Sequence, residues 1–263
     1  MATNTLNKIL AAVILTSAVL VSGCVSTTSK PRQAPDPEAA YQQHIKLAMQ
    51  YIGTKNRDLA RVHLDKAARF DSRSTRAQMS QLHNGYALLY QLERETELAK
   101  THYRKSLASN RNDSMARYNF GAFLFNQGRF EDAHKQIKVV SEDLSYERRP
   151  QAFYILGLCQ YRLNQQQQAL DSFERATQLM PRFAAPYLDA AEIYFAQQSY
   201  PRAKRALDQH AYLAQATARS LWLAVRLEEQ FGNKDAASSR GLQLKNLFPY
   251  SKENLEYQKW LKR

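Results

Sequence analysis

One short motif recurs six times along this chain of 263 residues, and the repetition limits the possible folds more than any other feature. The motif begins with alanine, places a bulky residue four positions later and usually a small residue three positions after that. Successive leading alanines are separated by 39, 34, 36, 34 and 34 residues. The sixth copy is degenerate, because glycine takes the bulky position. The leading residues are Ala60, Ala99, Ala133, Ala169, Ala203 and Ala237.

Each copy has the spacing of an α-helix, in which residues four apart lie on one face. Twelve positions before each leading alanine stands another alanine, a glycine or, in the last copy, a valine. Small residues let two helices approach closely, so each unit is predicted to be two helices joined by a turn. The chain has only 8 glycines, which disfavours a β-sandwich, a barrel and a nucleotide-binding fold with Gly-rich turns.

Helix–turn–helix units with this period are typical of the tetratricopeptide repeat (TPR), whose units must stack because one alone cannot bury its apolar face. The sequence therefore predicts an all-α TPR superhelical solenoid of six helix-turn-helix repeats over residues 38–251. The repeats are expected at about 41–74, 80–113, 114–147, 150–183, 184–217 and 218–251. Residues 252–263 are predicted to form a C-terminal capping helix with Leu255, Trp260 and Leu261 on one side.

The first 23 residues are predicted to be a lipoprotein signal peptide. Lys8 precedes an apolar run of 13 residues, Ile9–Val21. A helix needs about 20 residues to span a bilayer comfortably, so this run is short for a transmembrane anchor. The run ends in Val21-Ser22-Gly23-Cys24, which resembles the lipobox of bacterial lipoproteins. The alternative is an ordinary signal peptide with a chance cysteine.

The lipobox resemblance implies that Cys24 is the lipidation site, carrying a diacylglyceryl group and an N-acyl chain, with no other cofactor. Several acyl chains anchor a protein stably where one chain is marginal. The residue after Cys24 is Val25 rather than aspartate, which in such lipoproteins implies sorting to the outer membrane. Residues 24–37 are rich in Ser, Thr and Pro and are predicted to be a flexible tether.

Motifs for common catalytic chemistry are absent: the sequence has no G-x-x-x-x-G-K-[ST], G-x-G-x-x-G or H-E-x-x-H. His44 and His83 share one repeat position, and His63 and His102 share another, which favours packing or groove polarity over metal binding. Cys159 lies in an apolar stretch and is predicted to be a buried structural thiol. We therefore expect no catalytic residue, no metal site and no enzyme.

The TPR resemblance implies that the first helix of each repeat lines a concave groove. Carrying the groove positions onto this sequence gives mainly apolar and aromatic side chains, suited to an apolar peptide or an amphipathic helix. The alternative is that part of this set belongs to the core between repeats. The candidate groove residues are Ile45, Met49, Ile52, Asn84, Leu88, Met115, Tyr118, Phe125, Tyr154, Leu158 and Tyr161.

The chain is basic, with a formal net charge of +13. Charge of this kind concerns partners and surfaces rather than the fold. No nucleic-acid-binding module is present, so we expect no nucleic-acid partner. Anionic lipid head groups or an acidic protein partner fit the charge better, and no small-molecule substrate is expected.

Several segments resemble the PilW/PilF family of outer-membrane TPR lipoproteins in type IV pilus biogenesis. The segments in the sixth repeat are the more specific ones, because the generic TPR pattern is weakest there. The segments are Tyr118–Leu124, Gln127–Ala133, Leu144–Arg148, Ala218–Leu227 and Gly241–Pro249.

This resemblance implies a pilotin-like lipoprotein anchored on the periplasmic face of the outer membrane. Its TPR groove would bind the subunit of the type IV pilus secretin, bring it to the membrane and promote assembly of its multimer. The main alternative is another periplasmic TPR scaffold lipoprotein, an adaptor for peptidoglycan enzymes or for outer-membrane assembly. A third hypothesis, an enzyme with an unusual site, would need a convergent polar cluster that the repeat pattern does not provide.

Overall fold

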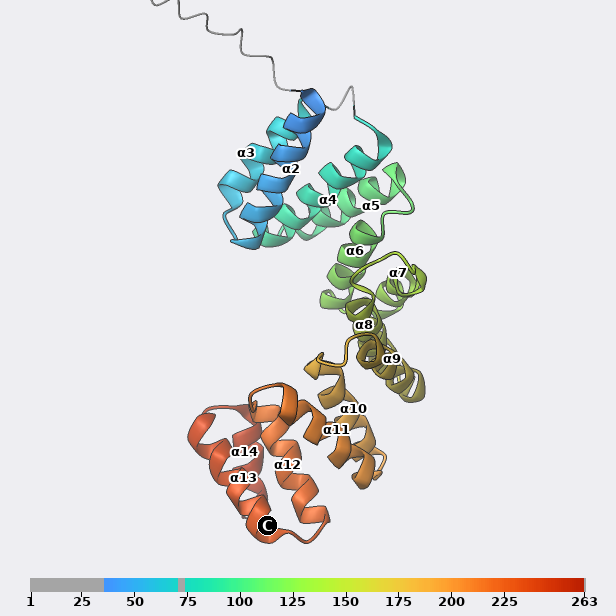
Figure 1. Cartoon of the computed structure of the whole chain (residues 1–263). Coiled ribbons are helices and arrows are strands. Elements are labelled where there is room, and N and C mark those ends of the chain that lie inside the picture. Colours follow the sequence, from blue (N-terminus) through green and yellow to red (C-terminus); the bar gives the residue numbers. More distant parts are fainter. Residues whose placement is uncertain (1–35, 71–73, 263) are drawn as a thin grey trace, which may run out of the picture. The chain divides into compact units, whose positions relative to one another are not determined.

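The computed structural model describes residues 36–70 and 74–262, and in these two ranges the chain forms helices and no β-strand. The predicted signal peptide (1–23), Cys24 and most of the predicted tether lie outside the described residues. The helices, labelled in Figure 1, are α2 (Pro37–Gly53), α3 (Arg57–Ala68), α4 (Arg76–Glu93), α5 (Thr96–Ser109), α6 (Ser114–Asn126), α7 (Phe130–Glu142), α8 (Arg149–Arg162), α9 (Gln166–Leu179), α10 (Ala184–Ala196), α11 (Tyr200–Leu213), α12 (Ala218–Gln230), α13 (Lys234–Leu247) and α14 (Lys252–Trp260).

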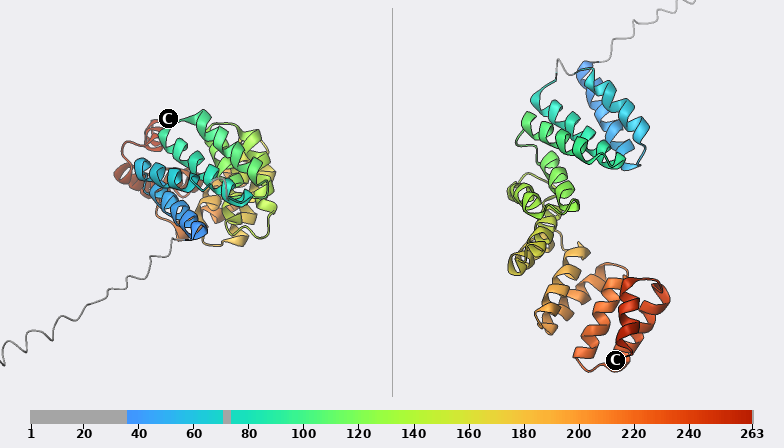
Figure 2. Two further views of the ribbon diagram at one scale, coloured as in Figure 1. Left: turned by 90° about the horizontal axis from the view of Figure 1, so that it is seen from above. Right: turned by 180° about the vertical axis from the view of Figure 1, so that it is seen from behind.

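Twelve of these helices form six consecutive pairs, and α14 follows the last pair. Figure 2 shows each second helix lying beside the first helix of its pair, as in α4 with α5 and α12 with α13. Within residues 41–262, neighbouring pairs pack on one another, for example α9 on α10 and α11 on α12. The predicted all-α TPR fold with six repeats and a terminal helix is confirmed.

The second repeat begins one helical turn earlier than the expected residue 80. Helix α4 starts at Arg76 because Thr75 and Gln78 form a reciprocal capping box. The Gln78 amide nitrogen donates to the Thr75 hydroxyl over 3.2 Å, and the Thr75 amide nitrogen donates to the Gln78 side-chain oxygen over 2.6 Å. A capping box satisfies two amide groups that a helix end otherwise leaves unpaired, so this local signal sets the boundary.

Close contacts between paired helices depend on glycine facing a bulky side chain. A Cβ atom on Gly121 would lie 2.6 Å from the Ile137 side chain. On Gly157 it would lie 2.5 Å from the Phe173 ring and 3.1 Å from the carbonyl oxygen of Ala169. Both glycines stand at the small position of the first helix, and both bulky residues follow the leading alanine of the second helix by four. The small and bulky positions of the sequence motif are therefore the residues that pack against each other between the paired helices.

The degenerate sixth copy is completed by the terminal helix. Gly241 occupies the bulky position of α13, and the Tyr257 ring of α14 fills the space that a side chain would take there. The Asn254 amide donates to the Pro249 carbonyl over 2.7 Å and fixes the start of α14. Tyr257 and Trp260 pack α14 on the last repeat, whereas Leu255 and Leu261 are each 57% exposed.

No helix within residues 36–70 and 74–262 combines the length and apolar character needed to cross a bilayer.

Replacing Gly157 with alanine tests the close contact. We expect Gly157→Ala to lower the free energy of unfolding by about 1–2 kcal/mol, because overpacking against an aromatic ring outweighs the gain of about 1 kcal/mol in helix propensity. The matched control is Gly53→Ala, since nothing lies within 4 Å of a Cβ atom there. That variant should be unchanged or slightly more stable. Urea unfolding followed by far-UV circular dichroism measures both, and equal effects would contradict the packing argument.

Candidate partner-binding surface

The predicted groove residues all lie on the first helices of the first four repeats, α2, α4, α6 and α8. Ile45, Asn84 and Tyr118 are buried, with 9%, 4% and 9% of their surface exposed. Met115 and Tyr161 are exposed, at 51% and 42%. The half-buried members are Met49, Ile52, Leu88, Phe125, Tyr154 and Leu158. The structure therefore divides the set into a supporting group and a surface group.

The three buried residues hold the first helices in place. Ile45 belongs to the apolar core of the first repeat. Asn84 accepts a hydrogen bond from the Asn119 side-chain amide over 3.1 Å, which joins α4 to α6. The Tyr118 ring packs in the core between α6 and α8, and the Arg148 guanidinium lies 5.0 Å from its centre. These side chains shape the surface but offer a partner little area.

Met115 provides exposed apolar surface at the start of α6. It lines a hollow of about 470 Å³ together with Tyr146 and Arg148 from the loop before α8. The flexible thioether of Met115, next to the Tyr146 ring and the Arg148 guanidinium, can adapt its conformation to a bound peptide.

A second aromatic patch lies where α6 ends and α8 ends. The Phe125 and Phe130 ring centres are 5.3 Å apart. The Arg162 guanidinium lies 5.9 Å from the first ring centre and 5.6 Å from the second. Tyr161, exposed, precedes Arg162 on α8. Aromatic and arginine side chains are the residue types that most often dominate binding energy at protein interfaces.

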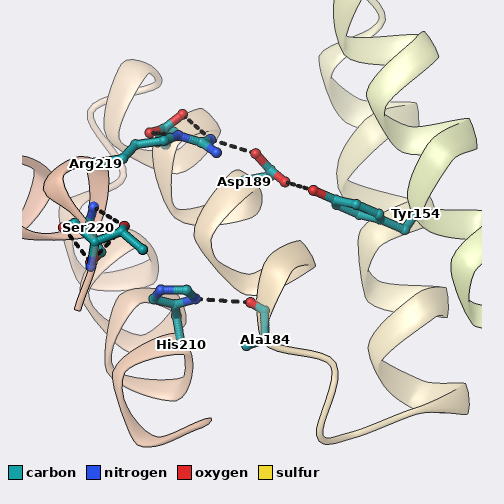
Figure 3. A network of polar contacts seen from close by, with 8 residues as sticks. Tyr154, Ala184, Asp189, His210, Arg219 and Ser220 are labelled. Carbon is teal, nitrogen blue, oxygen red and sulfur yellow. Dashed lines mark hydrogen bonds and ion pairs between the residues drawn. The ribbon is translucent and has the colours of Figure 1, made fainter. Parts of the chain in front are cut away.

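Polar contacts link the first helices of the later repeats (Figure 3). The Tyr154 hydroxyl on α8 donates to Asp189 on α10 over 2.8 Å. Arg219 on α12 donates to the other oxygen of Asp189 over 2.5 Å and to both oxygens of Glu192 over 2.5 and 2.6 Å. Burial, and then the charge and hydrogen bond of Asp189, raise the pKa of the Tyr154 hydroxyl above its ordinary range. The Tyr154 hydroxyl is therefore already engaged in a hydrogen bond within the protein, and only its ring is left for contact with a partner.

Sequence reasoning missed Asp189 and Arg219 as members of this surface. A spacing of 35 residues, one repeat plus one position, separates Tyr154 from Asp189 and also Asn84 from Asn119. Pairs of polar residues 35 positions apart in the sequence could therefore have identified Asp189 as a member of this surface. No comparable sequence pattern identified Arg219. Its two carboxylate partners lie in the preceding repeat, and the repeat spacing does not predict these ion pairs.

The histidines at equivalent repeat positions meet in pairs, one in each of the first two repeats. The Nδ1 atoms of His44 and His63 are 3.1 Å apart. The ring centres of His83 and His102 are 5.2 Å apart. In the part of the chain that the structure describes, no three His, Cys, Asp or Glu side chains gather as metal ligands would. These rings pack between the two helices of a repeat, as the interpretation of their spacing predicted.

Cys159 is fully buried in the core between α5, α6 and α8. Burial raises the pKa of its thiol to about 12, so the thiol stays protonated near neutral pH and is a poor nucleophile. The predicted structural role fits this position. Taken together, the fold and this surface define a TPR-repeat scaffold protein.

Comparison with known proteins narrows the class to a family. Residues 93–176 match the family model of the anaphase-promoting complex (cyclosome) subunit 3. The type IV pilus assembly protein PilF of Pseudomonas aeruginosa is 33% identical over 250 residues, which cover 94% of this chain and 97% of PilF. An uncharacterised Haemophilus influenzae protein is 29% identical over 157 residues, covering 60% of this chain and 82% of that protein.

Solved structures of PilF and PilW are also similar to this chain. The structure of P. aeruginosa PilF matches with a TM-score of 0.78 at 33% identity, covering 85% of this chain and 98% of that one. PilW, described as a widely conserved type IV pilus biogenesis factor, has the same fold, with a TM-score of 0.71 at 20% identity over 83% of this chain and 98% of its own. The chain belongs to the PilF family of TPR proteins in type IV pilus biogenesis.

The pairing of His83 with His102 predicts that stability depends on pH. Burial, and then the charges of His83 and Lys105, lower the pKa of His102 to about 4. The unfolded chain binds this proton near the ordinary value of about 6.5, so the stabilisation is complete above that pH and is lost as the pH falls toward 4. We expect His102 to account for a loss of about 1–2 kcal/mol on going from about pH 7 to about pH 4.5, because its half-buried ring is partly screened.

The variant His102→Phe should keep its stability at neutral pH, because the His102 Nδ1 atom is buried without a hydrogen-bond partner. It should also show a shallower fall in the urea midpoint with acid. The same pH dependence in both proteins would exclude His102 as the source.

Proposed function

We propose that this protein is a pilotin-like lipoprotein that binds the subunit of the type IV pilus secretin and promotes its assembly in the outer membrane. The observation that carries the proposal is the 33% identity with the pilus assembly protein PilF over 94% of this chain. The match spans nearly all of the chain, so it is not limited to a generic repeat.

The proposed mechanism uses two parts of the chain. Lipid on Cys24 holds the protein at the periplasmic face of the outer membrane. The exposed apolar and aromatic side chains of α6 and α8, with Met115 and Tyr161 the most accessible, hold a segment of the secretin subunit. Holding that segment keeps the client beside the membrane in which it assembles.

Binding is tested by recovering the tagged, acylated protein from detergent-solubilised envelopes and identifying its partners by mass spectrometry. The secretin is the expected main partner. Another envelope complex enriched in its place would leave the TPR fold intact and favour the alternative adaptor function.

The double variant Met115→Ser/Tyr161→Ser tests the surface. Both side chains are exposed, so we expect secretin recovery to fall at least tenfold while the melting temperature changes little. The matched control is Val139→Ser/Tyr212→Ser, which removes similar side chains, 49% and 85% exposed, from the second helices α7 and α11. Equal losses in the two proteins would contradict the proposed surface.

The variant Cys24→Ala tests the anchor. We expect a folded protein, with an unchanged circular dichroism spectrum, that no longer fractionates with the outer membrane and supports fewer pili. Continued fractionation of Cys24→Ala with the outer membrane would refute lipid anchoring at this residue. Loss of anchoring with normal secretin recovery in detergent would confirm that the two parts act separately.

A further inference from the structure

A cleft lined by none of the predicted groove residues has the features of a second binding site. It lies between α9, α10 and α11 and has a volume of about 350 Å³. Its inner wall is apolar: Leu170 and Phe173 are buried, and Tyr194 is half-buried. Arg202 and Arg205 of α11 stand exposed at its edge. None of the predicted groove residues lines this α9–α11 cleft.

Two other pairs of neighbouring repeats in this chain have a cleft at the corresponding position, so the residues that line the three clefts can be compared. An equivalent cleft of about 430 Å³ lies between α7, α8 and α9, and one of about 210 Å³ between α11, α12 and α13. At the repeat position of Tyr194, these two clefts have Gln160 and Glu228. At the position of Leu170 they have His134 and Lys204. Only the α9–α11 cleft of the three therefore replaces polar residues with apolar ones at both positions.

Several polar groups of the two equivalent clefts are paired internally. The Ser172 hydroxyl donates to the Gln160 side-chain oxygen over 2.6 Å. Lys204 lies 2.7 Å from Asp208 and 3.6 Å from Glu228. The residues at the position of Tyr194 in these two clefts, Gln160 and Glu228, thus already have partners within the chain.

The two arginines of the α9–α11 cleft are placed differently. Among the described residues, neither Arg202 nor Arg205 forms an ion pair with a carboxylate. The Arg202 guanidinium lies 5.9 Å from the Tyr194 ring centre. At the repeat position of Arg205, the cleft between α7 and α9 has Asp171 instead. The cleft thus joins an apolar wall to two arginines that form no ion pair within the described residues.

We propose that the α9–α11 cleft binds a peptide segment of a protein partner that carries a large apolar side chain beside an acidic one. The apolar side chain enters the cleft against Phe173 and Tyr194, and the carboxylate pairs with Arg205. The volume of the cleft is at the lower end for ligand pockets and suits one or two large side chains. The complementary charges fix the register and speed the encounter.

Glu174, on the opposite wall, favours this occupant over a lipid surface. Its carboxylate lines the same cleft as the two arginines. A phosphate-bearing membrane would bring many negative charges toward Glu174, whereas a single peptide carboxylate can sit on the α11 side alone. Glu174 also accepts a hydrogen bond from Gln178 over 3.1 Å, which holds it on the α9 side.

The test pans a phage-displayed library of random dodecapeptides on the full chain and measures selected synthetic peptides by fluorescence anisotropy. We expect enriched peptides to place Asp or Glu next to Leu, Phe or Trp. Replacing that acid by its amide, or raising the salt concentration, should weaken binding severalfold. No enrichment, or enriched peptides without an acidic residue, would overturn the proposal.

The decisive variant is Arg205→Asp, which installs the residue found at the equivalent position 171. It should weaken binding of the selected peptide at least tenfold. The matched control is Arg175→Ala on the exposed face of α9, which should change binding less than twofold. Circular dichroism melting verifies that both variants are folded. Equal binding to the wild-type protein and Arg205→Asp would refute the site.

Two further measurements separate this site from its alternatives. Vesicles containing phosphatidylglycerol should bind wild type and Arg205→Asp equally; binding lost only in Arg205→Asp would assign the cleft to a lipid surface and overturn the peptide proposal. The variant Met115→Ser/Tyr161→Ser should bind the selected peptide normally. Loss of peptide binding in that variant would place the peptide on α6 and α8 instead.

Discussion

The architecture depends on one kind of contact, in which a position with a small side chain, or none, on one helix receives a bulky side chain from its neighbour. Gly121 receives Ile137, and Gly157 receives the Phe173 ring, within single repeats. Gly85 makes the corresponding contact with a leucine of the preceding repeat, Leu64. Such contacts set the distance between helices, and the rest of the packing follows because a closely packed interior cannot stretch to accommodate a different spacing.

A second constraint operates between successive first helices. Side chains 35 positions apart meet across neighbouring repeats, and their character matches: Asn84 pairs with an amide, and Tyr154 pairs with the buried Asp189. Leu188 and Leu223, also 35 positions apart, lie in one apolar cluster of the fifth and sixth repeats. A slipped stacking of repeats would bury the side chains of Asn84 or Asp189 without their present partners. Leaving a buried polar group unpaired costs about 1–3 kcal/mol, which favours the native order.

The repeat spacing predicted the helix pairs and their order, because the packing that needs small and bulky residues leaves them at fixed intervals. Periodicity could not tell how much of each first helix its neighbours cover. Of the set predicted to line the groove, Ile45 and Tyr118 are therefore buried while Met115 is exposed, and the sequence alone had left open which members belong to the core. The role of Tyr257 in α14 was not predicted, because the space that its ring fills is defined by Gly241, a residue of another helix.

The contact between Tyr257 and Gly241 also covers the open face of the sixth repeat. In a stacked array, the open face of each unit is a template for one more unit. Here the Tyr257 ring of α14 packs on that face, and the indole rings of Trp222 and Trp260 pack against it. Growth at this end by another unit would first require α14 to detach. Helix α14 therefore covers the face of the sixth repeat on which another unit would otherwise stack.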